Sequence, residues 1–146
     1  MKRFILETKV YGWAIIYTIL TILLHWRFNF AFDIGAFIVG AVIGLHLLEI
    51  IEALLNLPKS PFRTVIAQGL VTLLTIFVLT SSRLYIGKSV VLLLNLRYIY
   101  LQQDEYKRQK SLEKWFSGIT DRIQPRSYLI ILYIIFLFET LLFIIT

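Results

Sequence analysis

Long apolar stretches alternate with short polar breaks along the whole chain. Each stretch holds about 17 to 24 residues, close to the ~20 that a helix needs to cross the ~30 Å hydrocarbon core of a bilayer. Since backbone polar groups in lipid must be paired within their own segment, such stretches are expected to be helices. The pattern predicts an all-α fold: a polytopic transmembrane helix bundle in a single domain covering residues 1–146. The five expected spans are residues 10–26, 34–57, 62–80, 84–101 and 128–146.

The fourth stretch is the weakest of the five, because Lys88, Asn95 and Arg97 interrupt it. With a cytoplasmic N-terminus and five crossings, twelve of the fifteen Lys and Arg residues lie at or near the cytoplasmic side, which is the bias typical of membrane proteins. Without the fourth crossing, the basic segment 102–127 would face outward and this bias would largely reverse. We therefore expect a multi-pass protein of the bacterial cytoplasmic (inner) membrane, with the N-terminus cytoplasmic and the C-terminus outside.

Local signals mark the breaks between the expected spans. Ser60 suits an N-cap with Pro61 at the first helical position, and Pro125 suits the opening turn of the last helix. Ser81 and Ser82 are expected to cap the fourth helix. The first stretch has a basic start but no small-residue cleavage site after it, so we expect an uncleaved helix and not a signal peptide.

The longest polar break contains an amphipathic pattern. Apolar residues recur at helical spacing within residues 108–123, and basic residues fill the other faces. The pattern predicts an interfacial helix on the cytoplasmic leaflet, either a membrane-surface connector or a docking surface for a soluble partner. Its apolar positions are Leu112, Trp115, Phe116, Ile119 and Ile123.

The second stretch has two distinct faces. His46, Glu49 and Glu52 fall within an arc of roughly 120° when successive residues turn by ~100°. Gly40 and Gly44 lie on nearly the opposite face, and their Gly-x-x-x-Gly spacing allows another helix backbone to approach closely. A helix with a polar face and a small-residue face has little surface left for lipid, so we expect it to be the central helix of the bundle.

Further polar residues lie at comparable depths on the other spans. An ionised carboxylate near the bilayer centre costs ~2.5–3.5 kcal/mol on insertion scales, so such groups need partners. We expect Arg97 to pair with Glu49 or Glu52, and Glu139 to lie closer in depth to His46. The complete intramembrane polar cluster is predicted to be His46, Glu49, Glu52, Gln68, Asn95, Arg97 and Glu139.

Three interpretations of this polar cluster are open. The first, which we favour, is a structural network that fixes the order of the helices. The second is a metal or catalytic site formed by His46, Glu49, Glu52 and Glu139. The third is a proton or cation pathway. Under the favoured interpretation no catalytic residue and no metal ligand is predicted.

The composition restricts the function classes further. Hydrophobic residues make up 58% of the chain and charged residues 16%, with no cysteine, which excludes a disordered chain, a disulfide scaffold and a thiolate site. The net charge of +6 is explained by topology and anionic lipid headgroups, so no nucleic-acid partner is expected. The two histidines, His25 and His46, lie at different depths, so no haem is expected. No motif for another cofactor is present.

Several short motifs in the middle of the chain form a recognisable series. They are Gly40-Ala-Val-Ile-Gly44, Leu47-Leu-Glu-Ile-Ile-Glu52, Ser60-Pro-Phe-Arg63-Thr, Leu79-Thr-Ser-Ser82, Gly87-Lys88, Gln102 and Trp115-Phe116. With these motifs the chain resembles uncharacterised small polytopic membrane proteins of candidate-phyla bacteria. Those proteins are in turn distantly similar to bacterial membrane-bound metal-dependent hydrolases.

The metal motifs of the hydrolase family are not retained here. Its Asp-x-Asp-His element would fall on Glu49-Ile-Ile-Glu52, which has no histidine, and its His-Arg element would fall on Phe62-Arg63. Its His-x-x-x-Asp element would fall on Asn95 and Ile99 or on Arg97 and Leu101. The resemblance therefore implies a shared fold and a lost metal rather than a shared activity.

These observations favour a non-catalytic integral membrane protein that acts as a scaffold or as a small subunit of a membrane assembly. A divergent membrane-embedded hydrolase is the first alternative, and proton or cation translocation through the Glu and His residues is the second. The expected partners are the lipid bilayer and either other membrane subunits or further copies of this chain.

Overall fold

The computed structural model describes residues 8–24, 31–55, 64–109 and 124–145. These residues form five α-helices and no strand, which confirms the predicted all-α class. The helices are α1 (Thr8–Leu24), α2 (Ala31–Leu55), α3 (Val65–Ser81), α4 (Tyr85–Gln109) and α5 (Pro125–Ile145). The predicted interfacial helix at 108–123, with Leu112, Trp115, Phe116, Ile119 and Ile123, lies almost entirely outside the described residues.

The predicted end of the fourth span at residue 101 is not the end of its helix, because α4 continues to Gln109. The added residues are polar and charged, and they include Gln, Glu, Lys and Arg, which are good helix formers. Hydropathy marks where a helix stops being apolar, whereas the backbone hydrogen bonds continue as long as no glycine or proline interrupts them.

Helix α3 begins later than predicted. Its N-cap is Thr64, whose side-chain oxygen accepts a hydrogen bond from the backbone N–H of Ala67 at 3.2 Å. The predicted cap Ser60 and the predicted first helical residue Pro61 lie outside the described residues. Thr64 is one of the residue types preferred at an N-cap, because its short side chain can accept a hydrogen bond from a backbone N–H of the first turn.

Ser82 is the C-cap of α3 and not the N-cap of α4, which corrects the prediction for this break. Its hydroxyl accepts a hydrogen bond from the backbone N–H of Leu84 at 3.1 Å and so closes the short connection before α4 begins at Tyr85. Pro125 is the first residue of α5, as predicted, because proline suits the first turn, where its missing N–H has no intrahelical acceptor.

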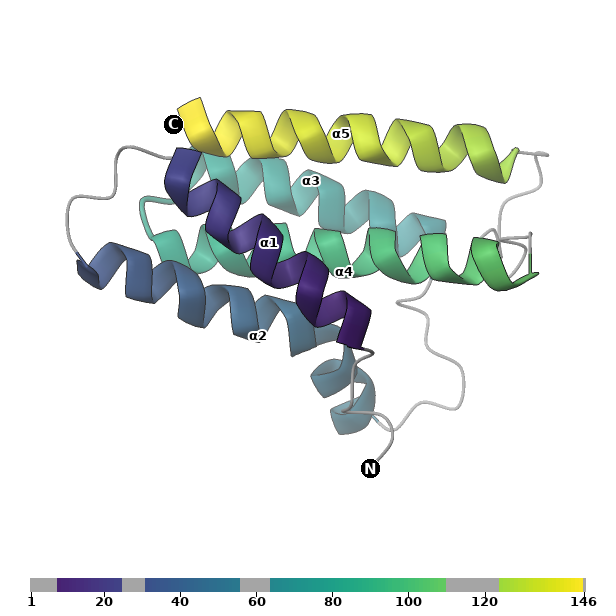
Figure 1. Cartoon of the computed structure of the whole chain (residues 1–146), viewed down its shortest axis with the longest axis horizontal. Helices are drawn as coiled ribbons and strands as arrows, with labels where there is room; N and C mark the ends of the chain where they lie inside the picture. The colour runs from purple at the N-terminus through teal and green to yellow at the C-terminus, as the bar shows by residue number, and fades with distance from the viewer. Residues whose placement is uncertain (1–7, 25–30, 56–63, 110–123, 146) are drawn as a thin grey trace.

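Successive helices run in opposite directions (Figure 1). Helices α1, α3 and α5 run one way, and α2 and α4 run the other. Because α1 and α5 run in the same direction, α1 begins at one end of the bundle and α5 ends at the other. Contacts agree with this arrangement: Gly40 faces Ile86 and Gly44 faces Val90, as expected for the parallel helices α2 and α4.

Helix α4 is the centre of the bundle and packs against each of the other four helices. Its apolar side chains Leu92, Leu93, Tyr98 and Ile99 are almost completely buried. The expectation that the second span would be central is wrong. Among the described helices, α2 packs on α4 and α1 only. Its glycines and Glu49 all face the same neighbour, α4. The opposite side of α2 is therefore left without a partner among the described helices, and it carries exposed apolar residues.

The glycines of α2 bring its backbone against that of α4. A Cβ atom at Gly40 would overlap the side chain of Ser89 and the carbonyl of Ile86, and one at Gly44 would overlap the backbone of Val90. Only residues without a side chain permit this distance between the two helices, which is the packing role that the Gly-x-x-x-Gly spacing predicts.

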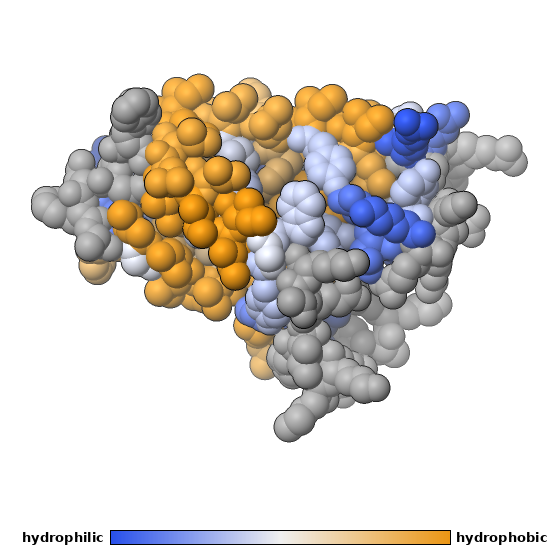
Figure 2. Space-filling model, in the orientation of Figure 1, coloured by the Kyte–Doolittle hydropathy of each residue, from blue (hydrophilic) through white to orange (hydrophobic). Residues whose placement is uncertain are grey.

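The outer surface of the bundle is apolar over most of its length. Leucine, isoleucine and phenylalanine side chains are exposed on α1, α2, α3 and α5. Figure 2 shows this apolar surface, with hydrophilic residues gathered toward the end of the bundle where α4 ends and α5 begins. Within the described ranges, two helical segments are long and apolar enough to cross a membrane, Phe32–Leu55 and Arg126–Ile145, and α1 and α3 hold shorter apolar segments.

Candidate functional site

A chain of buried polar side chains crosses the bundle from α3 through α4 to α5. The amide nitrogen of Gln68 donates to Oδ1 of Asn95 at 2.6 Å, and Nδ2 of Asn95 donates to Oε2 of Glu139. Gln102, on α4, donates through Nε2 to Oε1 of Gln68 at 3.1 Å. Each of these four residues is at most 2% exposed. We refer to Gln68, Asn95, Gln102 and Glu139 as the amide network.

The amide network orients its own members. Asn95 accepts from Gln68 and donates to Glu139, so its side chain has one favourable orientation only. A buried donor or acceptor that loses its partner costs ~1–3 kcal/mol, so each bond helps to select the arrangement of three helices. Among the described residues, Oε1 of Glu139 has no hydrogen-bond partner.

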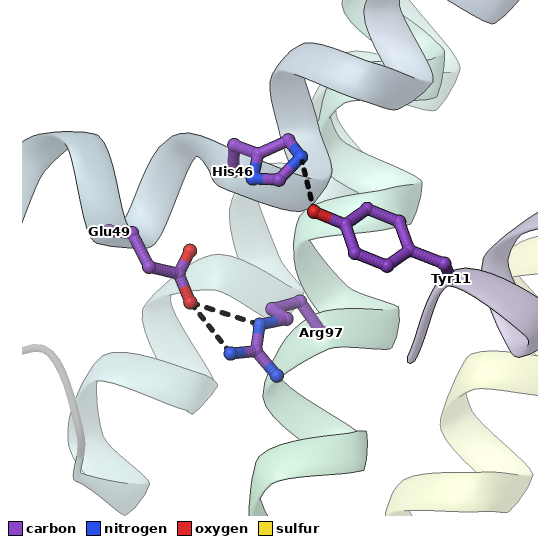
Figure 3. A network of polar contacts seen from close by, with 4 residues as sticks. All are labelled: Tyr11, His46, Glu49 and Arg97. Atoms are coloured by element: carbon purple, nitrogen blue, oxygen red, sulfur yellow. Dashed lines mark hydrogen bonds and ion pairs between the residues drawn. The ribbon is translucent and has the colours of Figure 1, made fainter. Parts of the chain in front are cut away.

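A buried ion pair joins α2 to α4 (Figure 3). Both Nη2 and Nε of Arg97 donate to the same oxygen of Glu49, Oε1, at 2.7 and 3.1 Å. Both residues are buried, and Oε2 of Glu49 has no hydrogen-bond partner among the described residues. The pairing of Arg97 with Glu49 that the sequence indicated is therefore present. It compensates two charges that would be costly to bury separately.

His46 points away from the ion pair and toward α1 (Figure 3). Its Nε2 lies 3.5 Å from the hydroxyl of Tyr11, and the two rings are 5.8 Å apart between centroids. The imidazole therefore connects α2 with α1, whereas the carboxylate of Glu49, one turn along the helix, connects α2 with α4. Glu52 is half-buried, one further turn along α2.

The predicted polar cluster is thus divided into separate groups. Glu139 joins Asn95 and Gln68 in the amide network, whereas His46 contacts Tyr11 on α1. The expectation that Glu139 and His46 lie at similar depths stays a prediction. The position of a residue along its helix predicts its depth but not which neighbouring helix it faces. His46 faces α1, while Asn95 faces α3 and α5. Within the described ranges, no group of three or more His, Asp or Glu side chains is placed to hold a metal ion.

Several polar contacts were not anticipated from the sequence, among them those of Gln102 and of Tyr17. Gln102 lies two turns after Asn95 on the same face of α4, so helical spacing alone would have suggested it as a further member of the amide network. The hydroxyl groups of Tyr17 and Thr140 lie 2.9 Å apart and connect α1 with α5. No sequence signal indicates that second pairing, because its members are on the first and last helices.

Lys88 is buried near the beginning of α4, beside aromatic rings. Its Nζ lies 5.7 Å from the ring centroid of Tyr85 and 5.9 Å from that of Phe143 on α5. An ammonium group within about 6 Å of a ring centroid is attracted by the ring quadrupole. A lysine that weakens the hydropathy of this span is thereby accommodated inside the bundle.

Apolar cavities lie on both sides of α1. One of about 300 Å³ lies between α1 and α2, with Tyr11 and His46 among its lining residues. Another of about 230 Å³ lies between α1 and the pair α4 and α5, where Tyr17, Tyr133 and Gln103 are among the lining residues. Helix α1 is therefore packed less closely on the bundle than α2 is on α4.

The arrangement supports helix-to-helix contacts more directly than it supports a reaction. No group of the described residues combines a nucleophile, a base and an orienting partner in the way that hydrolytic sites do. The resemblance to small membrane proteins of candidate-phyla bacteria, and through them to membrane-bound hydrolases, stays a prediction. In comparisons with known proteins, no family model, no curated protein and no solved structure matches the chain.

Proposed function

We propose that this chain is an integral protein of the bacterial cytoplasmic membrane, that it crosses the bilayer five times, and that it acts as a non-catalytic scaffold or small subunit of a membrane assembly. One observation carries the proposal: polar side chains are paired in the interior while apolar side chains cover the outside. Gln68, Asn95, Arg97 and Glu139 are buried, and Leu23, Phe32, Leu54 and Phe77 are exposed.

This distribution is unfavourable in water and favourable in lipid. Apolar surface gains ~25 cal/mol for each Å² removed from water, and the outer faces of α1, α2, α3 and α5 gain nothing in an aqueous environment. Polar groups surrounded by hydrocarbon need internal partners, which the amide network and the Glu49–Arg97 pair supply. Helix α4 carries three of these six residues, Asn95, Arg97 and Gln102, and its central position keeps them away from lipid.

Helix lengths and directions support five crossings. At 1.5 Å per residue, α2 and α5, with 25 and 21 residues, are ~38 and ~32 Å long, enough for a ~30 Å hydrocarbon core. Helices α1 and α3, with 17 residues each, reach ~26 Å, a mismatch that a bilayer accommodates at modest cost. Because helix directions alternate, the beginnings of α1, α3 and α5 and the ends of α2 and α4 lie toward one end of the bundle (Figure 1). This arrangement supports a single cytoplasmic side for these helix ends.

The scaffold role follows from what the polar groups do. The side-chain hydrogen bonds of Tyr17, Gln68 and Arg97 each join two helices. The exposed apolar faces of α2 and α5 remain available to lipid, to other subunits or to a second copy. Such a protein would position neighbours in the membrane and would need no substrate.

The topology is tested by fusing a reporter to the C-terminus and, separately, into the segment 102–127. We expect a periplasmic signal from the C-terminal fusion and a cytoplasmic signal from the internal one. A cytoplasmic signal from both fusions would contradict five crossings. The assembly is tested by purification from native membranes in mild detergent: a stoichiometric partner is expected, and recovery of a single chain with lipid alone would overturn the subunit role.

Proton or cation translocation is a second candidate, favoured by Glu139. This carboxyl group is completely buried, and its Oε1 has no hydrogen-bond partner among the described residues. In proteoliposomes, the wild-type chain should then carry a proton or sodium flux that Glu139→Gln abolishes. Equal leakage by wild type, Glu139→Gln and empty liposomes would exclude this function.

A further inference from the structure

The cavity between α1 and α2 is apolar along its length and polar at one end. Between its ends the walls are isoleucine, valine, leucine and alanine side chains with one threonine, Thr18 of α1. The aliphatic residues include Ile15 and Ile22 of α1, Val42 of α2 and Leu93 of α4. Its volume of about 300 Å³ is at the lower end of the ~300–1,000 Å³ that small-molecule sites occupy. An apolar cavity with few convergent polar groups is the usual form of a binding site for a largely apolar ligand.

The polar end is formed by Tyr11 and His46, which both line the cavity. Their side chains point toward each other (Figure 3). Their contact of 3.5 Å is at the limit of a hydrogen bond, so both groups keep hydrogen-bonding capacity for a third atom. A phenol and an imidazole can each donate to a carbonyl oxygen, and neither needs a charged ligand.

The length of the cavity matches one leaflet of a bilayer. Because α1 and α2 are antiparallel, Tyr11 and His46 form one end, and Ile22 and Ile38 form the other. Along α1 the distance from Tyr11 to Ile22 is ~16 Å at 1.5 Å per residue. Half of the ~30 Å hydrocarbon core is ~15 Å, which is the space that the acyl chains of one leaflet fill.

We propose that this cavity binds one acyl chain of a membrane phospholipid, with the ester carbonyl at Tyr11 and His46 and the chain end near Ile22 and Ile38. The inference rests on the membrane insertion proposed above and goes beyond it, because it assigns a specific lipid site to the bundle. The cavity on the other side of α1 is less suited to this ligand. There the hydroxyl of Tyr17 is already bonded to Thr140, and that of Tyr133 to Gln103.

The test uses the full chain in lipid nanodiscs that contain a phospholipid with a photoreactive group at the end of one acyl chain. After irradiation, the labelled residues are mapped by mass spectrometry. We expect the label to concentrate on peptides containing Ile22 or Ile38. Labelling spread evenly over the exposed faces of α2, α3 and α5 would identify ordinary boundary lipid and overturn the proposal.

A matched pair of variants makes the test specific. Val42 lines the cavity and is 57% exposed, whereas Val39 is 52% exposed on the same helix and does not line it. Both positions have room for a larger side chain, so both variants should fold. Val42→Trp should remove most of the labelling of Ile22 and Ile38 peptides, and Val39→Trp should leave it unchanged. An equal effect of the two variants would contradict the site.

The polar end is tested with Tyr11→Phe. Loss of one ordinary hydrogen bond should reduce specific labelling about fivefold in competition with unlabelled phospholipid. Unchanged labelling would show that the carbonyl is not held there and would overturn that part of the proposal. Cell fractionation distinguishes unchanged labelling from a failure of membrane insertion. A chain that does not insert would be absent from the membrane fraction of the cells, before any nanodisc is prepared.

Discussion

The contact between α2 and α4 differs in kind from the attachment of α1 to the bundle. At the first, two glycines let backbones touch and a buried ion pair joins the helices. At the second, two hydroxyl contacts, Tyr11 with His46 at 3.5 Å and Tyr17 with Thr140 at 2.9 Å, hold a helix that has cavities on both sides. A Cβ atom added at Gly12 of α1 would meet no atom of another described helix within 4 Å, so this glycine does not bring α1 closer to a neighbour.

The comparison shows where this fold is rigid and where it has room for a ligand. Close packing without side chains leaves no space, and a buried charge pair resists any separation of its partners. A helix held by a few polar contacts across apolar cavities can admit an acyl chain without loss of the bundle. The following variants test this contrast, from the largest expected effect to the smallest.

Arg97→Ala should be the most damaging single change at the α2–α4 contact. It leaves Glu49 buried without a counter-charge, which costs ~3–5 kcal/mol for a buried pair. Thermal unfolding in detergent measures the loss. The double variant Arg97→Met with Glu49→Leu should recover part of the stability, because no buried charge remains. A double variant as unstable as Arg97→Ala would mean that the pair contributes through packing only.

Asn95→Leu should destabilise the chain by about 2–4 kcal/mol. Two buried groups lose a hydrogen-bond partner at ~1–3 kcal/mol each, and one of them, the amide of Gln68, keeps its contact with Thr72. These groups are the amide of Gln68 and the carboxyl of Glu139. The control is Thr72→Val, which removes only the hydroxyl that Gln68 contacts at 3.3 Å and should cost less. Equal losses in chemical denaturation would contradict the central place of Asn95 in the amide network.

Gly44→Ala and Gly12→Ala should have opposite effects. A methyl group at Gly44 overlaps the backbone of Val90, and overpacking of this kind costs ~1–3 kcal/mol. At Gly12 there is open space, so the higher helix propensity of alanine should stabilise α1 by ~0.5–1 kcal/mol. If both variants unfold at a higher temperature than wild type, or both at a lower one, the contrast between the α2–α4 contact and the attachment of α1 is contradicted.

Tyr17→Phe should have the smallest effect, a loss of ~0.5–1.5 kcal/mol, because it removes one hydrogen bond between α1 and α5. We expect hydrogen exchange to accelerate in α1 while α4 remains protected. Tyr133→Phe, which removes a more exposed hydrogen bond to Gln103, serves as the comparison and should leave α1 unchanged. Faster exchange throughout the bundle would show that α1 is not a separately held element.

The sequence by itself determined the helices, the close approach of another helix at the Gly-x-x-x-Gly pair, and a carboxylate partner for Arg97 that is either Glu49 or Glu52. These features can be seen without coordinates. The apolar stretches and the spacing of Gly40 and Gly44 are patterns along single helices. The partner of Arg97 follows from the need of a buried charge for an opposite charge at similar depth. The start of α3 at Val65 and the continuation of α4 to Gln109 were missed, since caps and helix propensity extend beyond hydropathy.

Only the tertiary structure decided which helix lies at the centre and which polar residues meet. Helix α4 has the least apolar sequence of the five and is central because its polar side chains find partners on every side there. Periodicity places His46 and Glu49 on one broad face, but the packing of α1 and α4 sends them to different partners. The cavities beside α1 likewise arise from how whole helices cross, a relation between distant segments that no local pattern in the chain contains.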